Sequence, residues 1–398
     1  MTTTYFDKDA EQGTYRIESH TKVVIGKNVR ITASERIEDY YTDESIFWDN
    51  CGNELGRSLF FANGQETIEI CGEAGSLIYG NGGVWTGERK QRRPSLIRLV
   101  DCKNVTIRNL RLKDSPCWCI HLHNCENVTI EDVEIISKCN GNNDGIDIDC
   151  CRNVLVRNCV IDSGDDAVVL KSTKNILSEN IQIENCILSS RWAGFKIGTE
   201  SVGDFRDIRF CHNKILNSSG CAIKIVPVDG SVVEKILISD VTVFAGTGPI
   251  FIANGHRMRT YFPGESREQP GYIKDVTIEN VTANVYINPE EIINIGKGVV
   301  LATGTKEKPI GSFTLRNCFF AMPGGSRESS EQYPLAELTT QYPEFYTLGT
   351  APAWGAYLRN IETVTLENVV FHRKAEDKRQ EIITENVKHF VQEDGYDR

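Results

Sequence analysis

The stretch NVTIRNL at residues 104–110 recurs with the same pattern along most of the chain. Each copy opens on Asn or a similar residue, continues with three alternating β-forming residues and a polar pair, and closes on an apolar residue. This alternation is typical of a β-strand. The other copies are NVTIEDV at 127–133, NVLVRNC at 153–159, NIQIENC at 180–186, DIRFCHN at 207–213, KILISDV at 235–241, DVTIENV at 275–281, SFTLRNC at 312–318 and TVTLENV at 363–369.

The spacing of the copies decides the architecture. Consecutive copies begin 23, 26, 27, 27 and 28 residues apart, and the later ones begin 40, 37 and 51 residues apart. A short period with strands and no helical pattern is typical of a β-solenoid. A leucine-rich repeat is the competing architecture, but its LxxLxL frame and helical segments do not appear. We therefore predict an all-β fold, a single-stranded right-handed parallel β-helix with loop insertions on one face.

The repeat also suggests how the chain is organised. We expect one domain over residues 1–398, with an N-terminal cap region at about 1–21, the β-helix at about 22–372 and a C-terminal tail or cap at about 373–398. Because the open end of a solenoid exposes unpaired strand edges, a short C-terminal helix is one way to cover it. The stretched late spacings predict insertions around 245–272 and 320–358, which would build walls around a binding face.

Asn and Cys each recur at a fixed place in the coil. Asn tolerates the left-handed backbone of a turn and hydrogen-bonds along a stack, so we interpret these residues as a structural ladder. Recurrent Cys residues are interpreted as small apolar side chains stacked in the core. The Asn residues are Asn109, Asn158, Asn185, Asn280, Asn317 and Asn368, and the Cys residues are Cys125, Cys159, Cys186, Cys211 and Cys318.

Composition narrows the range of partners. The formal net charge of −11 disfavours nucleic acid, whose recognition needs clustered Lys and Arg, and it disfavours anionic membranes. An anionic substrate would need a local basic pocket. The N-terminus lacks the basic and apolar regions of a signal peptide, and no segment is long and apolar enough for a membrane helix. We expect a cytoplasmic protein without membrane contact, and oligomerisation is possible.

Two stretches break the apolar pattern with clustered acids. Residues 142–149 read NNDGIDID, and residues 162–171 read DSGDDAVVLK. Asp165 follows Asp144 by 21 residues, close to one coil, and strands one coil apart lie ~4.8 Å apart. Asp144 and Asp165 should therefore be neighbours, with Asp166 beside them. Repulsion among three such acids raises at least one pKa, which provides both an acid and a base, as a glycosidase requires.

Two further acids, Asp147 and Asp149, alternate within the same predicted strand. Acids near coil turns also cap backbone N–H groups or bind calcium. We interpret this pair as structural. No Cys pairs occur at zinc-site spacing, and we predict neither a metal nor another cofactor.

The aspartate motifs resemble those of the polygalacturonase family of glycoside hydrolases, family 28. The family's Asn-x-Asp motif appears as Asn142-Asn143-Asp144, and its paired aspartates appear as Gly164-Asp165-Asp166. The resemblance covers about residues 22–372. It also includes IYGNGGVW at 78–85, RRPSLIRLVDCKNVTIRNLRLKDSPCWCIHLHNCENVTI at 92–130, FKIGTES at 195–201 and PEFYTLGTAPAWGAYLRNIETVTLENV at 343–369.

The resemblance implies a role for each acid. Asp165 would be the general acid, and Asp144 and Asp166 would hold and deprotonate the attacking water. Members of the family invert the anomeric configuration, which implies carboxyl groups roughly 6.5–9.5 Å apart across the scissile bond. No metal is implied.

Two motifs of the family are altered in this chain. Where the family has Gly-His-Gly, this sequence has Ala193 at the His position. Where the family has Arg-Ile-Lys, the sequence reads Ala222-Ile223-Lys224, so only the Lys remains. In polygalacturonases that Arg and Lys hold the substrate carboxylate, so the changes weaken the case for ordinary galacturonan.

Other cations are candidates to replace the missing charge. Lys171, Lys196 and Lys224 are 25 and 28 residues apart, which predicts a basic column one coil apart beside the acids. It would bind a uronate or lower the pKa of the Asp residues, although solvated Lys residues are common on strand surfaces. Glu200 is a candidate to bind a sugar hydroxyl.

Further candidate contacts lie on both sides of the acids. Asn142 belongs to the first motif, and Trp118 and His121 lie about one coil before Asp144. Trp118 would stack on a sugar or fill the core, and His121 would contact the ligand or bond within its strand. Arg257 and Arg259 in the 245–272 insertion are candidates for the missing guanidinium, because the Arg fork suits a carboxylate.

Three functions remain open on these grounds. The first is an inverting glycoside hydrolase that acts on pectin-derived oligosaccharides containing galacturonic acid or rhamnose, from a chain end. The second is a β-helix polysaccharide lyase or epimerase, which the Lys column would suit. The third is a noncatalytic carbohydrate-binding β-helix, favoured by the missing His and Arg. The order of Asp144, Asp165 and Asp166 favours hydrolysis.

Overall fold

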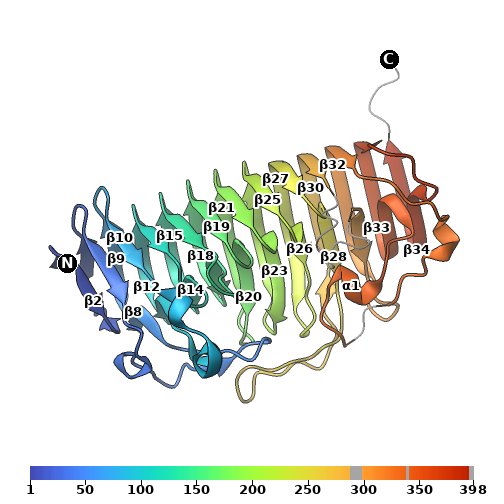
Figure 1. Cartoon of the computed structure of the whole chain (residues 1–398). Coiled ribbons are helices and arrows are strands. Elements are labelled where there is room, and N and C mark those ends of the chain that lie inside the picture. The colour runs from blue at the N-terminus through green and yellow to red at the C-terminus, as the bar shows by residue number, and fades with distance from the viewer. Residues whose placement is uncertain (287–297, 338–339, 394–398) are drawn as a thin grey trace.

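The computed structural model describes residues 1–286, 298–337 and 340–393. It is a right-handed parallel β-helix in which nearly every strand pairs with the strand one coil before it and the strand one coil after it (Figure 1). The strands form three columns that run the length of the molecule. The predicted fold class is therefore confirmed.

Column 1 is the column that carries the residues discussed below. Its strands pair in parallel from coil to coil. They are β3 (Tyr15–Arg16), β8 (Ser58–Asn63), β11 (Ser95–Val100), β14 (Ile120–His123), β17 (Ile146–Asp149), β20 (Val168–Ser172), β23 (Ala193–Ser201), β26 (Cys221–Ile225), β28 (Ile250–Ala253), β31 (Val300–Thr303) and the first part of β33 (Ala353–Arg373).

Column 2 contains all nine copies of the repeat that predicted the fold. Its strands are β1 (Thr2–Phe6), β4 (Thr21–Ile25), β9 (Glu66–Gly72), β12 (Lys103–Arg108), β15 (Glu126–Glu131), β18 (Arg152–Arg157), β21 (Ser178–Glu184), β24 (Phe205–Cys211), β27 (Val232–Gly246), β30 (Asp275–Val285), β32 (Ile310–Met322) and the rest of β33, with β29 (Tyr272–Ile273) beside β27. Column 3 comprises β2 (Ala10–Gln12), β5 (Arg30–Ala33), β10 (Leu77–Tyr79), β13 (Arg111–Lys113), β16 (Glu134–Ser137), β19 (Val160–Ser163), β22 (Ile187–Ser190) and β25 (Lys214–Ser218). It continues in the last parts of β27, β30, β32 and β33.

Both ends of the β-helix differ from expectation. β1 already pairs with β4, so the coil begins within the expected N-terminal cap. At the other end β34 (Gln380–Glu393) pairs along β33, so this segment is a strand and the alternative of a covering helix is wrong for it. The tail residues 394–398 lie outside the described residues. Ile382 and Val387 of this strand pack against the core and help to hold it on the last coil.

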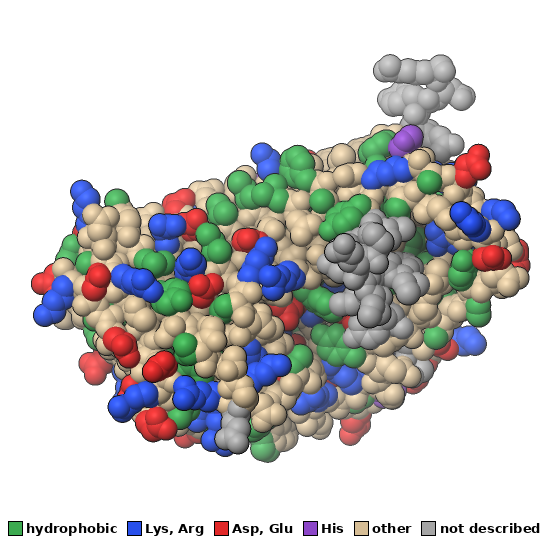
Figure 2. All heavy atoms as spheres, in the orientation of Figure 1, with side chains coloured by type: hydrophobic (Ala, Val, Ile, Leu, Met, Phe, Trp, Pro, Cys, Tyr) green, Lys and Arg blue, Asp and Glu red, His purple; other side chains and the backbone are tan. Residues whose placement is uncertain are grey.

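Short elements in the loops complete the fold. They are the antiparallel pair β6 (Phe47–Trp48) and β7 (Glu54–Leu55), the 3₁₀ turns η1 (Ile37–Asp39), η2 (Gly82–Val84), η3 (Gly87–Arg92) and η5 (Ser330–Gln332), and α1 (Phe345–Leu348). In the described part of the chain no helix is long and apolar enough to cross a membrane. On the face shown in Figure 2, acidic and basic side chains are interspersed.

The core lies inside the coils and follows the alternation of the strands. In column 1 Ile120 and Leu122 of β14 point inward into the main apolar cluster, whereas His121 and His123 point outward. The recurrent Cys residues are buried as predicted, except that Cys211 is only partly buried. All six predicted ladder Asn residues have positive φ. Side-chain bonds link Asn280, Asn317 and Asn368 along the stack.

Candidate active site

The three acids singled out in the sequence lie together at the start of two adjacent column 1 strands. Asp144 precedes β17, and Asp165 and Asp166 precede β20. The main-chain N–H of Gly145 donates to the Asp166 carbonyl at 2.9 Å. Asp166, rather than Asp165, is therefore level with Asp144. One carboxyl oxygen from each of the three acids lies within 4.8 Å of the others, which is closer than the expected 6.5–9.5 Å.

Each acid has a different environment. Asp166 is buried, accepts a hydrogen bond from Lys196 Nζ at 2.7 Å, and accepts another from the Ala193 main-chain N–H at 3.1 Å. Asp144 is also buried, and its Oδ1 has no hydrogen-bond partner among the described residues. Asp165 is only partly buried and is the most solvent-accessible of the three. Asp165 is therefore the best placed to meet an incoming ligand.

Burial and mutual repulsion perturb the acids. Burial, with the negative charges of Asp147 and Asp165, raises the pKa of Asp144 well above its usual range. Burial and the charge of Asp166 raise the pKa of Asp165 to about 6. The group thus contains carboxyls that hold a proton near neutral pH, as an acid catalyst must.

The predicted basic column is only partly correct. Lys196 of β23 and Lys224 of β26 are in register, but Lys171 of β20 is level with Asp149 and lies in a different row. Lys171 Nζ lies 3.1 Å from Glu200 Oε2 and 3.8 Å from Asp144 Oδ2. The Lys residues therefore form ion pairs with carboxylates of the protein itself.

Glu200 belongs to the same charge network. Burial acts to raise its pKa, but the charges of Lys171 and Arg257 outweigh this and lower the pKa to about 2. Its Oε1 accepts a hydrogen bond from Asn50 Nδ2 at 2.7 Å. Glu200 is therefore an ionised acceptor that joins the β23 strand to the loop between β6 and β7.

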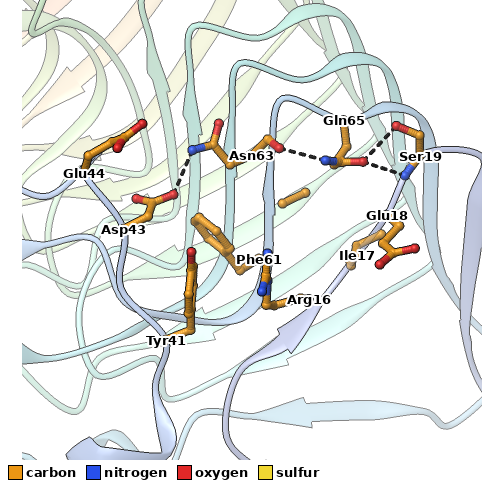
Figure 3. Close-up of a pocket in the computed structure, with 11 residues that line it drawn as sticks. Arg16, Ile17, Glu18, Ser19, Tyr41, Asp43, Glu44, Phe61, Asn63 and Gln65 are labelled. Carbon is orange, nitrogen blue, oxygen red and sulfur yellow. Dashed lines mark hydrogen bonds between the residues drawn. The ribbon is translucent and has the colours of Figure 1, made fainter.

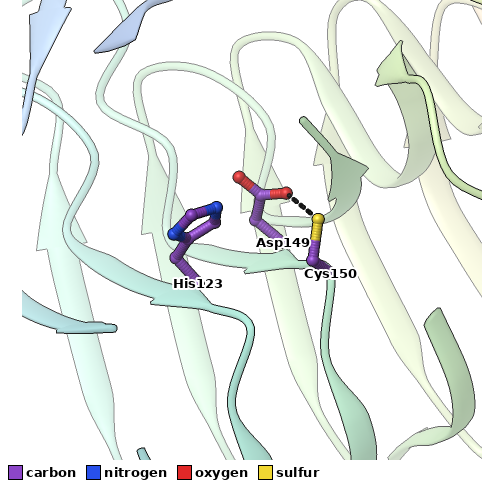
Figure 4. A group of neighbouring side chains, drawn as sticks. All are labelled: His123, Asp149 and Cys150. Carbon is purple, nitrogen blue, oxygen red and sulfur yellow. Dashed lines mark hydrogen bonds between the residues drawn. The ribbon is translucent and has the colours of Figure 1, made fainter. Parts of the chain in front are cut away.

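Asp147 and Asp149 have different environments, although both are fully buried. Asp149 accepts hydrogen bonds from the main-chain N–H and the hydroxyl of Thr173 at 2.9 and 2.8 Å. It lies beside His123 and Cys150, whose thiol donates to it (Figure 4). These bonds fit the structural interpretation. Asp147 has no hydrogen bond to either oxygen among the described residues and lies 3.6 Å from Lys171. Burial raises the pKa of this carboxyl well above its usual range.

The acids line a small cavity of about 30 Å³, which has room for about one water molecule. Loop residues that the sequence analysis did not single out also form part of its wall. They could not be predicted because they come from distant segments of the chain that carry no repeat or motif. The lining residues are Asp49, Asn50, Cys51, Trp118, Asn142, Asp144, Asp165, Asp166, Lys171, Lys196, Glu200 and Tyr342.

Two of the other predicted contacts line this cavity. Asn142 Oδ1 accepts hydrogen bonds from Arg93 and Asn53, so its side chain is fixed by the protein. Trp118 is almost fully buried, with Lys171 Nζ 4.2 Å from its ring centroid. One face of the indole is therefore already covered by a cation.

The remaining predicted contacts do not line the cavity. His121 is fully buried between Arg98 and Asp149, so it is a bonded strand residue. Arg257 forms an ion pair with Asp229. Lys224 is paired in the same way with Glu344.

Arg259 likewise lies outside the cavity lining. It donates to the main-chain carbonyl of Asp49 at 2.6 Å. The two insertion Arg residues therefore hold loops in place, and the expectation that they supply a guanidinium to the site is not met in this structure.

A second, larger cavity of about 770 Å³ lies nearer the N-terminal end (Figure 3). Phe61 is three coils before Asp147 in the column 1 register, or ~14 Å along the axis. Arg16 lies over the Tyr41 ring in this cavity, and Asn63 donates to Asp43. None of the predicted catalytic residues lines it.

Comparison with known proteins identifies the family of the chain. A family profile described as glycosyl hydrolases family 28 matches residues 26–308, and the chain belongs to this family. A probable polygalacturonase of Vitis vinifera is 30% identical over 253 residues, which are 58% of this chain and 50% of that protein. Exopolygalacturonase X of Aspergillus niger is 28% identical over 215 residues, 51% of this chain and 46% of that protein.

The chain thus spans about half the length of the curated relatives it matches. Among solved structures, a hyperthermoactive exopolygalacturonase from Thermotoga maritima shares the fold with a TM-score of 0.66 at 19% identity. The match covers 93% of this chain and 84% of that one.

Proposed function

We propose that this protein is an inverting glycoside hydrolase that removes residues from the ends of pectin-derived oligosaccharides. The observation that carries the proposal is the cluster of Asp144, Asp165 and Asp166 at one end of two adjacent strands, in a chain of family 28. Relatives named polygalacturonase and exopolygalacturonase support pectin as the source of the substrate.

In the proposed reaction Asp165 is the general acid. It gives its proton to the glycosidic oxygen as the bond from that oxygen to the anomeric carbon breaks. A water molecule held between Asp144 and Asp166 attacks the anomeric carbon from the opposite face and gives a proton to this pair. Oxygens within 4.8 Å of each other can both accept hydrogen bonds from one water, which supports this placement.

The walls of the cavity support action at a chain end. The β6–β7 loop contributes Asn50 to its wall, and the insertion before β33 contributes Tyr342. Walls on two sides suit the terminal residue of a chain better than an internal residue, which needs a groove open at both ends.

Defined pectic oligosaccharides test the proposal, with the anomer of the first product followed by NMR. We expect an inverted anomer and release of terminal residues from the first minutes. A retained anomer would show that the close carboxyl spacing reflects a double-displacement mechanism. An ultraviolet-absorbing unsaturated product would instead establish a lyase, and the complete lack of turnover would favour a noncatalytic binding protein.

Replacement of the general acid tests its assigned role. We expect Asp165→Asn to lower kcat by roughly 10²- to 10⁴-fold, the usual contribution of a positioned acid, and to leave the circular dichroism spectrum unchanged. Near-normal turnover in this variant would remove Asp165 from the mechanism. Asp162→Asn, at a partly exposed acid paired with Lys138, is the matched control.

We also propose that the protein acts inside the cell on small imported oligosaccharides. Its fourteen cysteines are free thiols, a state that reducing compartments maintain. Cell fractionation with an antibody to the protein tests this placement, and recovery from the culture medium would contradict it.

A further inference from the structure

Lys224 is held in a buried ion pair within the protein. Lys224 Nζ is paired with Glu344 Oε1, and both side chains are fully buried. The indole N–H of Trp192 donates to the same Glu344 oxygen at 3.1 Å. An ammonium and an N–H that converge on one carboxylate form a carboxylate-binding arrangement, and here a residue of the protein itself occupies it.

This arrangement lies next to the catalytic acids. Lys224 is in register with Lys196, so the two lie one strand spacing apart, ~4.8 Å. Lys196 lines the cavity and bonds Asp166. Glu344 precedes α1 and lies two residues after Tyr342, which also lines the cavity. Glu344 thus neutralises Lys224, the cation one coil beyond Lys196.

The charges around the cavity leave an excess of acid. The described lining residues include five carboxyl groups and two ammonium groups, and each of these ammonium groups is already paired with one of the lining carboxylates. The ionisable residues are Asp49, Asp144, Asp165, Asp166, Glu200, Lys171 and Lys196. Even with one or two acids protonated, the lining carries no surplus positive charge. Interactions between charges are strong in a site shielded from water.

We infer that the sugar residue cleaved by this protein is uncharged, and that Glu344 determines this specificity by holding Lys224. The inference rests on the proposed hydrolase function and names the substrate class at the same site. A uronate placed against the acids would meet like charge, and both ammonium groups of the lining are already paired with its carboxylates. Such repulsion rejects a ligand as effectively as a clash. A neutral glycosyl residue, of the kind that pectin also contains, meets no such barrier.

The test compares one sugar chain in two charge states. Trigalacturonate and its fully methyl-esterified form are titrated calorimetrically into the Asp165→Asn protein at pH 7, so that binding is measured without turnover. We expect the uncharged ester to bind at least tenfold more tightly than the free acid. The free acid binding as tightly as the ester, or more tightly, overturns the inference.

Variants of the ion pair test whether Glu344 causes the weaker binding of the free acid. In the same Asp165→Asn background, Glu344→Gln should improve binding of the free acid about tenfold and change binding of the ester less than twofold, because Lys224 becomes available. The double variant Lys224→Gln with Glu344→Gln removes both charges, leaves no unpaired buried ion, and should lose that gain. Equal affinities of the single and double variants for the free acid overturn the assignment to Lys224.

Hydrolysis assays separate this inference from the proposed function. If the unmodified protein hydrolyses pectic oligosaccharides but releases terminal galacturonate faster than neutral terminal residues, the hydrolase proposal stands and the inference on charge is overturned. If no pectic oligosaccharide is bound or cleaved, both are overturned.

Discussion

Asp165 shows how one residue obtains its chemistry from its surroundings. Burial, together with the charge of Asp166, raises its pKa to about 6. Burial, the larger cause, is not a property of the Gly-Asp-Asp motif, since the same motif on an open surface would have carboxyls near their ordinary pKa. The motif predicted which residues carry the chemistry, and the environment determines their protonation.

A pH–rate profile tests the acid role of Asp165. A general acid must be protonated in order to act, so kcat/KM should fall as the pH rises through about 6. Steady-state rates on one oligosaccharide between pH 4 and 8 provide the measurement. An activity that stays constant from pH 5 to 8 would contradict the assignment.

The same carboxyl makes stability depend on pH. Because its pKa is higher in the folded protein than in the unfolded chain, its favourable contribution is present below about pH 4 and is lost as the pH rises through about 6. Asp165→Asn does not titrate, so it should gain stability relative to the parent between pH 4 and 7. The gain should be of the order of 2 kcal/mol.

Chemical denaturation of parent and variant at both pH values measures this difference. A relative stability that does not change between pH 4 and 7 would show that Asp165 titrates normally.

At the scale of the element, the coil depends on turns that only certain residues adopt. Asn158 joins β18 to β19 with a φ of 55°, a left-handed conformation that other L-residues adopt at a cost. Its main-chain N–H donates to the Glu184 carbonyl of the next coil at 3.2 Å. The sequence predicted these turns because Asn recurs in the repeat, and their geometry is local.

Asn158 therefore allows a clean test of backbone strain, because its side chain is exposed. Asn158→Ala should lower the free energy of unfolding by roughly 1 kcal/mol, since Ala disfavours positive φ. Asn158→Gly should stay within about 0.5 kcal/mol of the parent, since Gly adopts this conformation readily. Urea denaturation measures both variants. Equal losses in both would assign the role of Asn158 to its side-chain contacts.

The pairing of the strands also explains why the prediction of a Lys column was only partly correct. The predicted column of three Lys residues counted residues from coil to coil, but β20 and β23 pair Val169, not Lys171, with Lys196. The number of residues in each coil varies, so a spacing that is only close to one coil does not place two side chains at the same level. Lys171 consequently joins Glu200 and the acids, and Lys196 and Lys224 form a separate row.

At the scale of the whole molecule, loops from distant parts of the chain enclose the cavity. Arg259, in the insertion after β28, donates to the Asp49 carbonyl of the β6–β7 loop at 2.6 Å. The two residues are 210 positions apart. Tyr261 contributes another link, because its hydroxyl donates to Asn50 Oδ1 at 3.2 Å. The β-helix aligns these loops over column 1, and the contacts between them define the wall.

Loss of the Arg259 link should loosen this wall without touching the acids. We expect Arg259→Ala to raise KM about tenfold and to change kcat by less than threefold, since a loose loop orders only when the sugar binds. Steady-state kinetics provides the two constants. Arg209→Ala, at an exposed Arg on column 2, is the control. A fall in kcat with an unchanged KM would show that the loop acts in the chemical step.

The sequence by itself determined the β-helix and the position of the acid cluster. The repeat marks one strand in each coil at a similar spacing, and the pairing of strands in adjacent coils follows from that spacing. Asp144 and Asp166 lie one coil apart, so the same period brings them together. Only the tertiary structure decided that Glu344 holds Lys224, that Arg257 and Arg259 fasten loops, and that Asn50 and Tyr342 enclose the site. Contacts of this kind join segments up to 211 residues apart, and they depend on how irregular loops fold back over the coils, which no periodic pattern encodes.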